Sequence, residues 1–287
     1  MKRILCLVLA LCLCGSVTAA CASVFVDAHG NEIELDPSLE AYSGFLLSGA
    51  DNAARRGETN LGDLWADALR WFAVSGRINE YFEEDDVTAG NDRLDADDDH
   101  IVALWNGGNL RADIAEGTFG AEELAQVLPY PNKAAVVYMT GAQLLEALEA
   151  ASQALPYTDE TASGCASFMQ ASGLKYTVDT AKEYDKGEAY GDHWFKAASL
   201  GRVTIAEVNG QPFDPEAVYA VITSNANFNG MDSSYIFKAA AGENEKSAVT
   251  TAVVRDVVWM FISEELGGVI GEEYAQAQGR ITLEAEE

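Results

Sequence analysis

Apolar residues recur at helical spacing in two long stretches of the chain. From Asn60 onward this spacing predicts an amphipathic helix, with Asn60 as its cap and Asp63 in its first turn. The apolar face of that helix consists of Leu61, Leu64, Trp65, Ala68, Leu69 and Phe72. A second helical pattern begins at Val253 and is expected to end at Gly267-Gly268. Because each apolar face must be buried, the two patterns predict a packed core.

Short apolar runs between turn residues predict strands at 134–139, 174–178, 203–208 and 218–222. Asn209-Gly210 lies between the last two runs, and this dipeptide favours a hairpin turn. We therefore expect 203–208 and 218–222 to form an antiparallel pair.

Three weaker local signals complete the pattern. Residues 24–35 alternate between apolar and polar around a Gly-containing turn, which predicts a small β-hairpin. Residues 120–128 form a short helical pattern that a proline ends. Thr140 and Gln143 have the spacing of a capping box and predict the start of a further helix.

Strands and helices alternate along the chain, with no internal repeat and no low-complexity linker. This order predicts an α/β fold class, a single compact domain of mixed sheet and helices over residues 55–284. Residues 22–54 are assigned to the hairpin arm and its connection, and residues 1–21 to a signal peptide.

The N-terminus has the three regions of a secretory signal: positive charge, an apolar run, and small residues before a cleavage site. We therefore expect an exported protein. The segment ending at Cys21 also resembles a bacterial lipoprotein site, where Cys21 would carry the lipid, and plain cleavage is the alternative. Beyond the signal, Cys165 is the only other cysteine, so the fold is not expected to depend on disulfides.

The chain is strongly acidic, with 46 acidic and 18 basic residues and a net charge of −28. This charge repels nucleic acid and anionic membrane surfaces, so we expect no nucleic-acid partner, and membrane contact only through a lipid anchor. An anionic ligand would need a local cationic site. Arg55, Arg56 and Arg111 lie beside polar loops and are the candidates.

Carboxylates are dense at 83–100, where Asp95, Asp97 and Asp99 alternate as in a calcium loop. His100 stands where such a loop has glycine, so we favour a solvated acidic loop over a calcium site, and predict no metal ligands.

The polar turn after the apolar run 101–104 is the strongest candidate binding segment. Gly107 and Gly108 allow positive φ angles and a close approach of backbone N–H groups to a ligand, and Asn106 and Arg111 add side-chain donors. This composition suits an anion or a sugar. An ordinary strand-to-helix turn is the alternative.

Several segments, in order, are similar to the C-terminal domain of the 5′-nucleotidase family, and the resemblance spans about residues 55–283. They are Glu58-Thr59-Asn60-Leu61-Gly62-Asp63-Leu64, Asn106-Gly107-Gly108-Asn109-Leu110-Arg111, Leu128-Pro129-Tyr130, Met139-Thr140-Gly141, Gly173-Leu174-Lys175-Tyr176-Thr177-Val178-Asp179, Asn209-Gly210-Gln211-Pro212 and Gly279-Arg280-Ile281-Thr282. Each segment alone is a weak signal, so the specificity lies in their number and order.

The resemblance implies that Asn106 and Arg111 bind the ribose and help to hold a nucleotide. It implies that Tyr130 supplies one of two rings that stack on the base, and that Asn225 and Asp232 are retained ligand contacts.

The chain departs from the family pattern at three positions. Ala226 stands at the second ring position and Met231 replaces a glycine, while Phe228 would point to the same face as Ala226 in an extended segment and is the candidate replacement ring. The family's arginine before Glu58 is displaced by one residue, which makes Arg56 the candidate.

In this family, an N-terminal metallophosphatase domain holds two metals and the catalytic histidine. His29, His100 and His193 are the only histidines, and Asp27-Ala28-His29 matches one metal motif by coincidence. Too few residues precede Glu58 for such a domain. We therefore expect no cofactor and no catalytic residue in this chain.

These inferences predict an exported protein that binds a nucleotide, nucleoside or nucleotide sugar, and that works with a separate metallophosphatase chain in nucleotide catabolism. A non-catalytic surface scaffold that has lost the pocket is the alternative.

Overall fold

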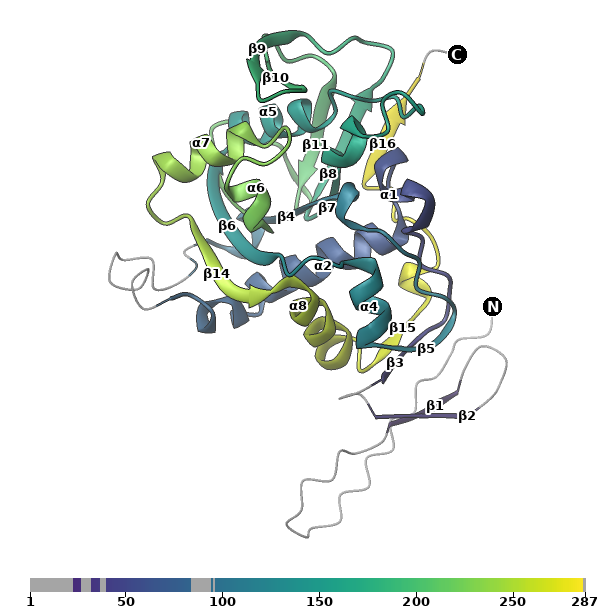
Figure 1. The fold of residues 1–287 in the computed structure, drawn as a ribbon. Coiled ribbons are helices and arrows are strands. Elements are labelled where there is room, and N and C mark those ends of the chain that lie inside the picture. The colour runs from purple at the N-terminus through teal and green to yellow at the C-terminus, as the bar shows by residue number, and fades with distance from the viewer. Residues whose placement is uncertain (1–22, 27–31, 37–39, 84–93, 95, 286–287) are drawn as a thin grey trace.

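The computed structural model describes residues 23–26, 32–36, 40–83, 94 and 96–285. A five-stranded sheet with strand order β14-β6-β13-β4-β7 forms the centre of the fold (Figure 1). Its strands are β4 (Ile101–Asn106), β6 (Lys133–Thr140), β7 (Met169–Ser172), β13 (Val218–Ser224) and β14 (Ala248–Val253). Only β4 and β13 run parallel to one another, so their carboxyl ends meet at one edge of the sheet.

Helices cover both faces of this sheet, which explains why all six residues of β4 are buried. Successive side chains of a strand point to opposite faces, so Ile101 and Ala103 pack in one apolar cluster, and Val102 and Leu104 in another. The helices α2 (Asn60–Val74) and α8 (Val254–Met260) contribute to the first cluster, and α5 (Gly141–Ala151) and α7 (Tyr235–Glu243) to the second (Figure 1).

A second sheet has the order β12-β11-β8-β16 and contains β8 (Leu174–Asp179), β11 (Val203–Val208), β12 (Gln211–Pro212) and β16 (Ile281–Glu284). The expected pairing of 203–208 with 218–222 is therefore wrong, since β11 pairs with β8 and β12, whereas β13 lies in the central sheet. Asn209-Gly210 does form a tight turn, with positive φ at both residues. The returning strand stops at Pro212, which has no N–H for further pairing, and the chain then crosses to the other sheet.

The smaller elements lie around these two sheets. They are β1 (Ser23–Val26), β2 (Glu32–Leu35), β3 (Glu40–Ser43), α1 (Ala53–Arg56), β5 (Gly117–Gly120), α4 (Ala121–Val127), β9 (Lys186–Tyr190), β10 (Trp194–Ala197), α6 (Asn225–Phe228), β15 (Val269–Ile270) and the 3-10 turns η1 (Ala50–Asn52), η2 (Arg77–Glu80), η4 (Asp98–His100), η5 (Gly107–Asn109), η6 (Gly164–Ser167) and η8 (Glu272–Tyr274). β1 and β2 pair antiparallel, as the alternation at 24–35 predicts.

Most of the predicted helix boundaries are confirmed, with one correction. The α5 capping box is present: the Thr140 hydroxyl accepts from the Gln143 N–H, and the Gln143 side chain accepts from the Thr140 N–H. Asn60, however, is not the cap of α2, because the Thr59 hydroxyl accepts the N–H of Gly62 at 3.0 Å. Asn60 is the first helical residue, and its side chain donates to the carbonyl oxygens of Leu46 and Tyr274.

The last helix also agrees with its pattern, because α8 continues into a π-helical turn at Phe261–Glu265 and the chain turns with positive φ at Gly267 and Gly268. No helix in the described ranges is both long and apolar enough to cross a bilayer.

Glu58 joins the two ends of the domain. Its carboxylate accepts the backbone N–H groups of Arg280 at 2.9 Å and Ile281 at 3.0 Å, at the start of β16. The Arg280 guanidinium pairs with Asp67 of α2 at 2.7 Å. The first and last segments of the family resemblance are therefore in direct contact, and this contact stabilises the fold.

Candidate functional site

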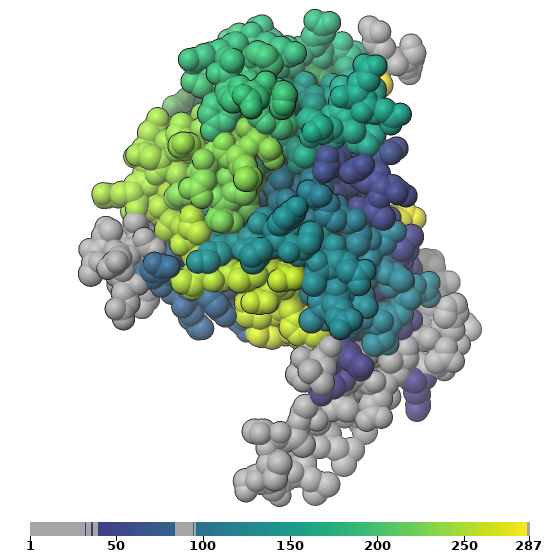
Figure 2. All heavy atoms as spheres, viewed as in Figure 1, coloured from purple at the N-terminus to yellow at the C-terminus, as the bar shows by residue number. Residues whose placement is uncertain are grey.

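The sheet topology brings the candidate residues to one edge. Asn106 is the last residue of β4, and Asn225 directly follows β13, which runs parallel to β4. Ligands of open α/β sheets bind beyond the carboxyl ends of parallel strands. Between α1 and α6, which lie near this edge, the surface has a recess (Figure 2).

The Gly-rich turn packs more tightly than its sequence suggests. A Cβ atom on Gly107 would lie 1.8 Å from the carbonyl oxygen of Ala54, and one on Gly108 would lie 2.6 Å from the Cβ of Ala166. Neither glycine has a positive φ, and the N–H of Gly107 donates to the carbonyl oxygen of Phe168 at 2.7 Å. The expectations of positive φ angles and of a free Gly107 N–H are therefore wrong. The two glycines instead allow η5 to pack closely against α1 and η6.

The side chains of the turn are held in place. The Asn109 amide donates to the Asn106 side-chain oxygen at 2.9 Å, and Asn106 itself is buried. Arg111 donates from Nε to the carbonyl oxygen of Gly108 at 2.5 Å, and its backbone N–H donates to Val127 of α4. The Nε bond holds the Arg111 side chain against the turn, and the N–H bond holds its backbone.

Tyr130 follows α4 and lies beside Arg111. The guanidinium carbon of Arg111 is 5.8 Å from the centre of the Tyr130 ring, within the range of a cation–π contact. Tyr130 is 51% exposed, which is unusual for a large aromatic side chain. An aromatic face and a cation are therefore available together at the surface.

The two arginines of α1 differ in their surroundings. Arg56 is exposed, and its guanidinium stacks 4.4 Å from the centre of the Tyr157 ring. Arg55 is partly buried and donates to the carbonyl oxygen of Ala162 at 2.9 Å. The sequence places both beside polar loops, and the family resemblance selects Arg56, because the family's arginine before Glu58 is displaced by one residue.

The charge of Arg55 interacts with those of Arg111 and Asp232. Burial lowers the pKa of Arg55, the positive charge of Arg111 lowers it further, and Asp232 acts in the opposite direction. Burial raises the pKa of Asp232, and the charge of Arg55 opposes that rise. Arg55 therefore interacts with two of the candidate residues, whereas the sequence names it only as a candidate cation and selects Arg56 for the site.

The segment after β13 is helical. The side-chain oxygen of Asn225 accepts the backbone N–H of Lys133 at 3.0 Å, which holds α6 against the start of β6. Lys133 is three residues after Tyr130 in the sequence. In a helix, residues two apart point in nearly opposite directions, so Phe228 does not share a face with Ala226. Phe228 is partly buried and packs against the second apolar cluster. The extended segment in which Phe228 would share a face with Ala226 is therefore not present.

Other candidates lie away from this site or outside the described residues. Cys165 is buried, and burial raises the pKa of its thiol, which makes it unreactive. Cys21, His29 and Asp95 belong to residues that the structure does not describe. In the part that it does describe, no group of three or more His, Cys, Asp or Glu side chains could hold a metal ion.

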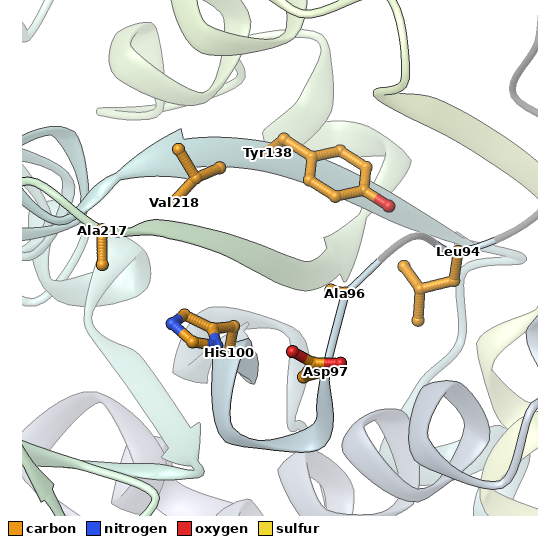
Figure 3. A pocket seen from close by; sticks show the side chains of 7 residues that line it. All are labelled: Leu94, Ala96, Asp97, His100, Tyr138, Ala217 and Val218. Carbon is orange, nitrogen blue, oxygen red and sulfur yellow. The ribbon is translucent and has the colours of Figure 1, made fainter.

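A second hollow of about 470 Å³ lies at the opposite edge of the sheet (Figure 3). It is lined by Leu94, Ala96, Asp97, His100, Tyr138, Ala217 and Val218. His100 and Ala217 directly precede β4 and β13, so this hollow is at the amino ends of the strands whose carboxyl ends carry the candidate site.

The fold and the site together define an α/β domain with a polar and aromatic surface at the carboxyl edge of its central sheet. A family model described as "5′-nucleotidase, C-terminal domain" matches residues 18–241. The chain therefore belongs to the 5′-nucleotidase C-terminal domain family, which confirms the resemblance in the sequence and the predicted fold class.

Individual proteins agree with this assignment. The cell wall protein Lmo0130 of Listeria monocytogenes serovar 1/2a (strain ATCC BAA-679 / EGD-e) is 29% identical over 191 residues, which are 64% of this chain and 19% of that protein. The trifunctional nucleotide phosphoesterase protein YfkN of Bacillus subtilis (strain 168) is 30% identical over 153 residues, which are 53% of this chain and 9% of that protein.

Among solved structures, the 5′-nucleotidase precursor from Thermus thermophilus superposes with a TM-score of 0.62 at 25% identity, over 87% of this chain and 40% of that one. The chain thus spans less than half the length of each of these three proteins.

Proposed function

We propose that this chain is an exported protein that binds a nucleotide or nucleoside at the carboxyl edge of its central sheet, as part of nucleotide catabolism. The single observation that carries the proposal is the exposed Tyr130 ring, whose centre lies 5.8 Å from the guanidinium carbon of Arg111. The charge interactions of Arg55 with Arg111 and Asp232 support it. The family assignment and the name of the Bacillus subtilis relative, a nucleotide phosphoesterase, support the same ligand class.

Each side chain suits one part of such a ligand. Arg55 and Arg111 repel each other in the free protein, and a bound anion relieves that repulsion while it accepts charge-assisted hydrogen bonds. The exposed Tyr130 ring offers a stacking surface for a base. The Asp232 carboxylate can accept hydrogen bonds from ribose hydroxyls, and the Asn106 amide can donate or accept them.

Catalysis is assigned to another component. The donor set of the described residues does not fit the family's two-metal centre, because it offers no group of three or more His, Cys, Asp or Glu side chains. Such metals would activate water for phosphoester hydrolysis in a metallophosphatase. We propose that a separate metallophosphatase supplies this step, and that the chain described here contributes affinity for the nucleotide.

Export is part of the same proposal. It rests on the N-terminal signal, and the names of the Listeria relative, a cell wall protein, and of the Thermus structure, a precursor, support it. We place the mature protein at the cell surface, in the periplasm or outside the cell, and assign Cys21 as the lipid attachment point if an anchor is present.

A thermal-shift screen of the mature protein with nucleosides, nucleoside monophosphates and nucleotide sugars tests this function. A ligand that binds only the folded state raises the melting temperature. We expect nucleoside monophosphates to give the largest rise, because they engage both the ring and the arginines. A uniformly flat response would support the second candidate, a surface scaffold without a pocket, which Ala226 at the position of the second ring favours.

A further inference from the structure

We infer that Glu58, Asp63 and the segment 278–281 form a proton-dependent latch, which holds the C-terminal strand β16 while Asp63 carries a proton and loosens it when that proton is lost. The inference does not depend on nucleotide binding. It rests on the hydrogen-bond donors around three neighbouring carboxyl groups and on the place of β16 at the edge of its sheet.

The start of β16 is attached to the N-terminal end of α2 through carboxyl groups. The backbone N–H of Gln278 donates to Asp63 at 3.0 Å. The backbone N–H groups of Arg280 and Ile281 donate to Glu58. Since β16 is the last strand of its sheet and pairs with β8 on one side, these bonds supply much of the remaining attachment of the segment.

The three carboxyl groups of this region have different numbers of donors. Asp67 accepts hydrogen bonds from three side chains, those of Ser172, Tyr274 and Arg280. Glu58 accepts two backbone N–H groups, whereas Asp63 accepts one, through Oδ2. The Oδ1 atom of Asp63 has no hydrogen-bond partner among the described residues, although the side chain is completely buried. Because donors stabilise the charged form and burial destabilises it, Asp63 is the group that holds a proton.

The charges around Asp63 favour the same assignment. The Arg280 guanidinium lies 2.7 Å from Asp67 but 3.8 Å from Asp63. Glu58 acts on Asp63 both as a like charge and as a hydrogen-bond partner. Two carboxyl groups can share a hydrogen bond only when one of them is protonated, and Oδ1 of Asp63 is free to carry that proton. Burial, opposed by Arg280 and aided by Glu58, raises the pKa of Asp63 to about 8.

The other ionisable groups of this region do not replace the proton. Arg70 of α2 donates to backbone carbonyl oxygens around the start of β4. The hydroxyl of Tyr176 on β8 donates to a backbone carbonyl oxygen, and that of Tyr274 on η8 donates to Asp67. Burial raises the pKa of both tyrosines, and neighbouring carboxylates raise it further, so both stay neutral. Asp63 is therefore the group of this cluster that loses a proton near pH 8.

Loss of that proton weakens the attachment of the segment. Ionised Asp63 can no longer donate to Glu58, and the two like charges then repel each other. Opening of the segment brings Asp63 into water, where an aspartate has its ordinary pKa of about 4. The closed state therefore has its full stability below about pH 4 and loses it progressively as the pH rises to about 8. The edge strand β16 is the element that is freed.

Hydrogen exchange of the mature protein, measured by mass spectrometry at pH 6, pH 7 and pH 8 and corrected for intrinsic exchange rates, tests the latch. We expect the protection of the amides of 278–284 to fall by about 30-fold to 100-fold between pH 6 and pH 8, close to tenfold per pH unit. The hairpin β9–β10 forms a separate sheet, so it is the internal reference and should keep its protection.

Asp63→Asn is the decisive variant, because its amide donates to Glu58 at every pH and still offers an oxygen acceptor for a backbone N–H. We expect the segment 278–284 of this variant to have the same protection at pH 6 and at pH 8. Asp179→Asn is the matched control, since it removes a carboxylate from the far end of the β8–β16 pair. This control should keep the pH dependence of the unaltered protein.

A change in the protection of 278–284 of less than about threefold between pH 6 and pH 8 would overturn the latch. So would a pH dependence that persists in Asp63→Asn. Equal protection of this segment and of the central strand β6 at every pH would also overturn it, because the segment would then open only when the whole domain unfolds. The pH series on the unaltered protein decides the question even if Asp63→Asn does not fold.

Discussion

A Cβ atom on Gly107 would meet the carbonyl oxygen of Ala54 at 1.8 Å, so the polar turn after β4 and the helix that carries Arg55 are in backbone contact. This contact sets how Arg55 lies relative to Asn106 and Arg111. The Gly-Gly pair thus serves the site indirectly, since it lets two site segments pack against each other.

Gly107→Ala tests this packing. We expect a loss of about 1–3 kcal/mol of unfolding free energy or more, because the added methyl group meets backbone and no flexible side chain can give way. Thermal unfolding should show a lower melting temperature. Gly201→Ala is the control, since nothing lies within 4 Å of its Cβ position and its φ is not in the left-handed region, so its melting temperature should hardly change.

Arg55 and Arg56 form a matched pair of variants. We expect Arg55→Gln to weaken nucleoside monophosphate binding by about 1.5–3 kcal/mol, the usual value of a hydrogen bond to a charged group. Arg56→Gln should cost less than about 0.5 kcal/mol, because Arg56 is exposed and stacked on Tyr157. Isothermal titration of both variants with a nucleoside monophosphate measures the two losses of affinity. A larger loss in Arg56→Gln would show that Arg56, the residue selected from the sequence, binds the ligand.

The stability of the fold should depend on pH through Asp63. Burial raises the pKa of Asp63 to about 8, and this effect outweighs the attraction of Arg280, whose guanidinium is 3.8 Å away but lies closer to Asp67. A carboxyl group with a raised pKa in the folded state binds its proton more tightly there than in the unfolded chain. Its contribution is therefore present at low pH and is lost as the pH rises from about 4 to about 8.

Melting temperatures of the unaltered protein and of Asp63→Asn, measured from pH 5 to pH 9, check this dependence. Asparagine keeps an oxygen acceptor for the N–H of Gln278, so the variant should fold. We expect the melting temperature of Asp63→Asn to rise relative to that of the unaltered protein as the pH rises towards 8. Parallel curves would show that Asp63 does not titrate in this range.

Removal of the buried carboxylate of Glu149 on α5 should strongly destabilise the fold. Glu149 accepts the backbone N–H groups of Arg202 and Val203 at the start of β11, and it is almost completely buried. Glu149→Ala leaves those donors unpaired and removes the stronger of the two carboxylate charges that act on the Arg202 side chain, so we expect a loss of about 3–5 kcal/mol. Denaturant unfolding measures it, and a loss below about 1 kcal/mol would contradict this role.

The sequence predicted the local elements well because their signals are local. The helical spacing from Asn60, the capping box at Thr140 and the apolar run 134–139 depend on residues a few positions apart, and all three elements are present. The partner of strand 203–208 was predicted wrongly, since hairpin signals show that the chain turns but not which sheet the next strand joins.

The site was predicted less completely for a related reason. Motif order selects Asn106, Arg111 and Tyr130 as candidates. Whether Arg55 or Arg56 turns towards them depends on the packing of α1 against η5 and η6, which lie far away in the sequence. The functions of Gly107 and Phe228 likewise follow from contacts across the fold.

Titration of the mature protein with adenosine 5′-monophosphate in a calorimeter tests the central claim most directly. We expect saturable binding with one site per chain, which Arg111→Ala weakens by about 1.5–3 kcal/mol through the loss of a charge-assisted hydrogen bond. Absence of binding heat at several temperatures, with a chain that melts cooperatively, would contradict the claim that this domain binds nucleotides.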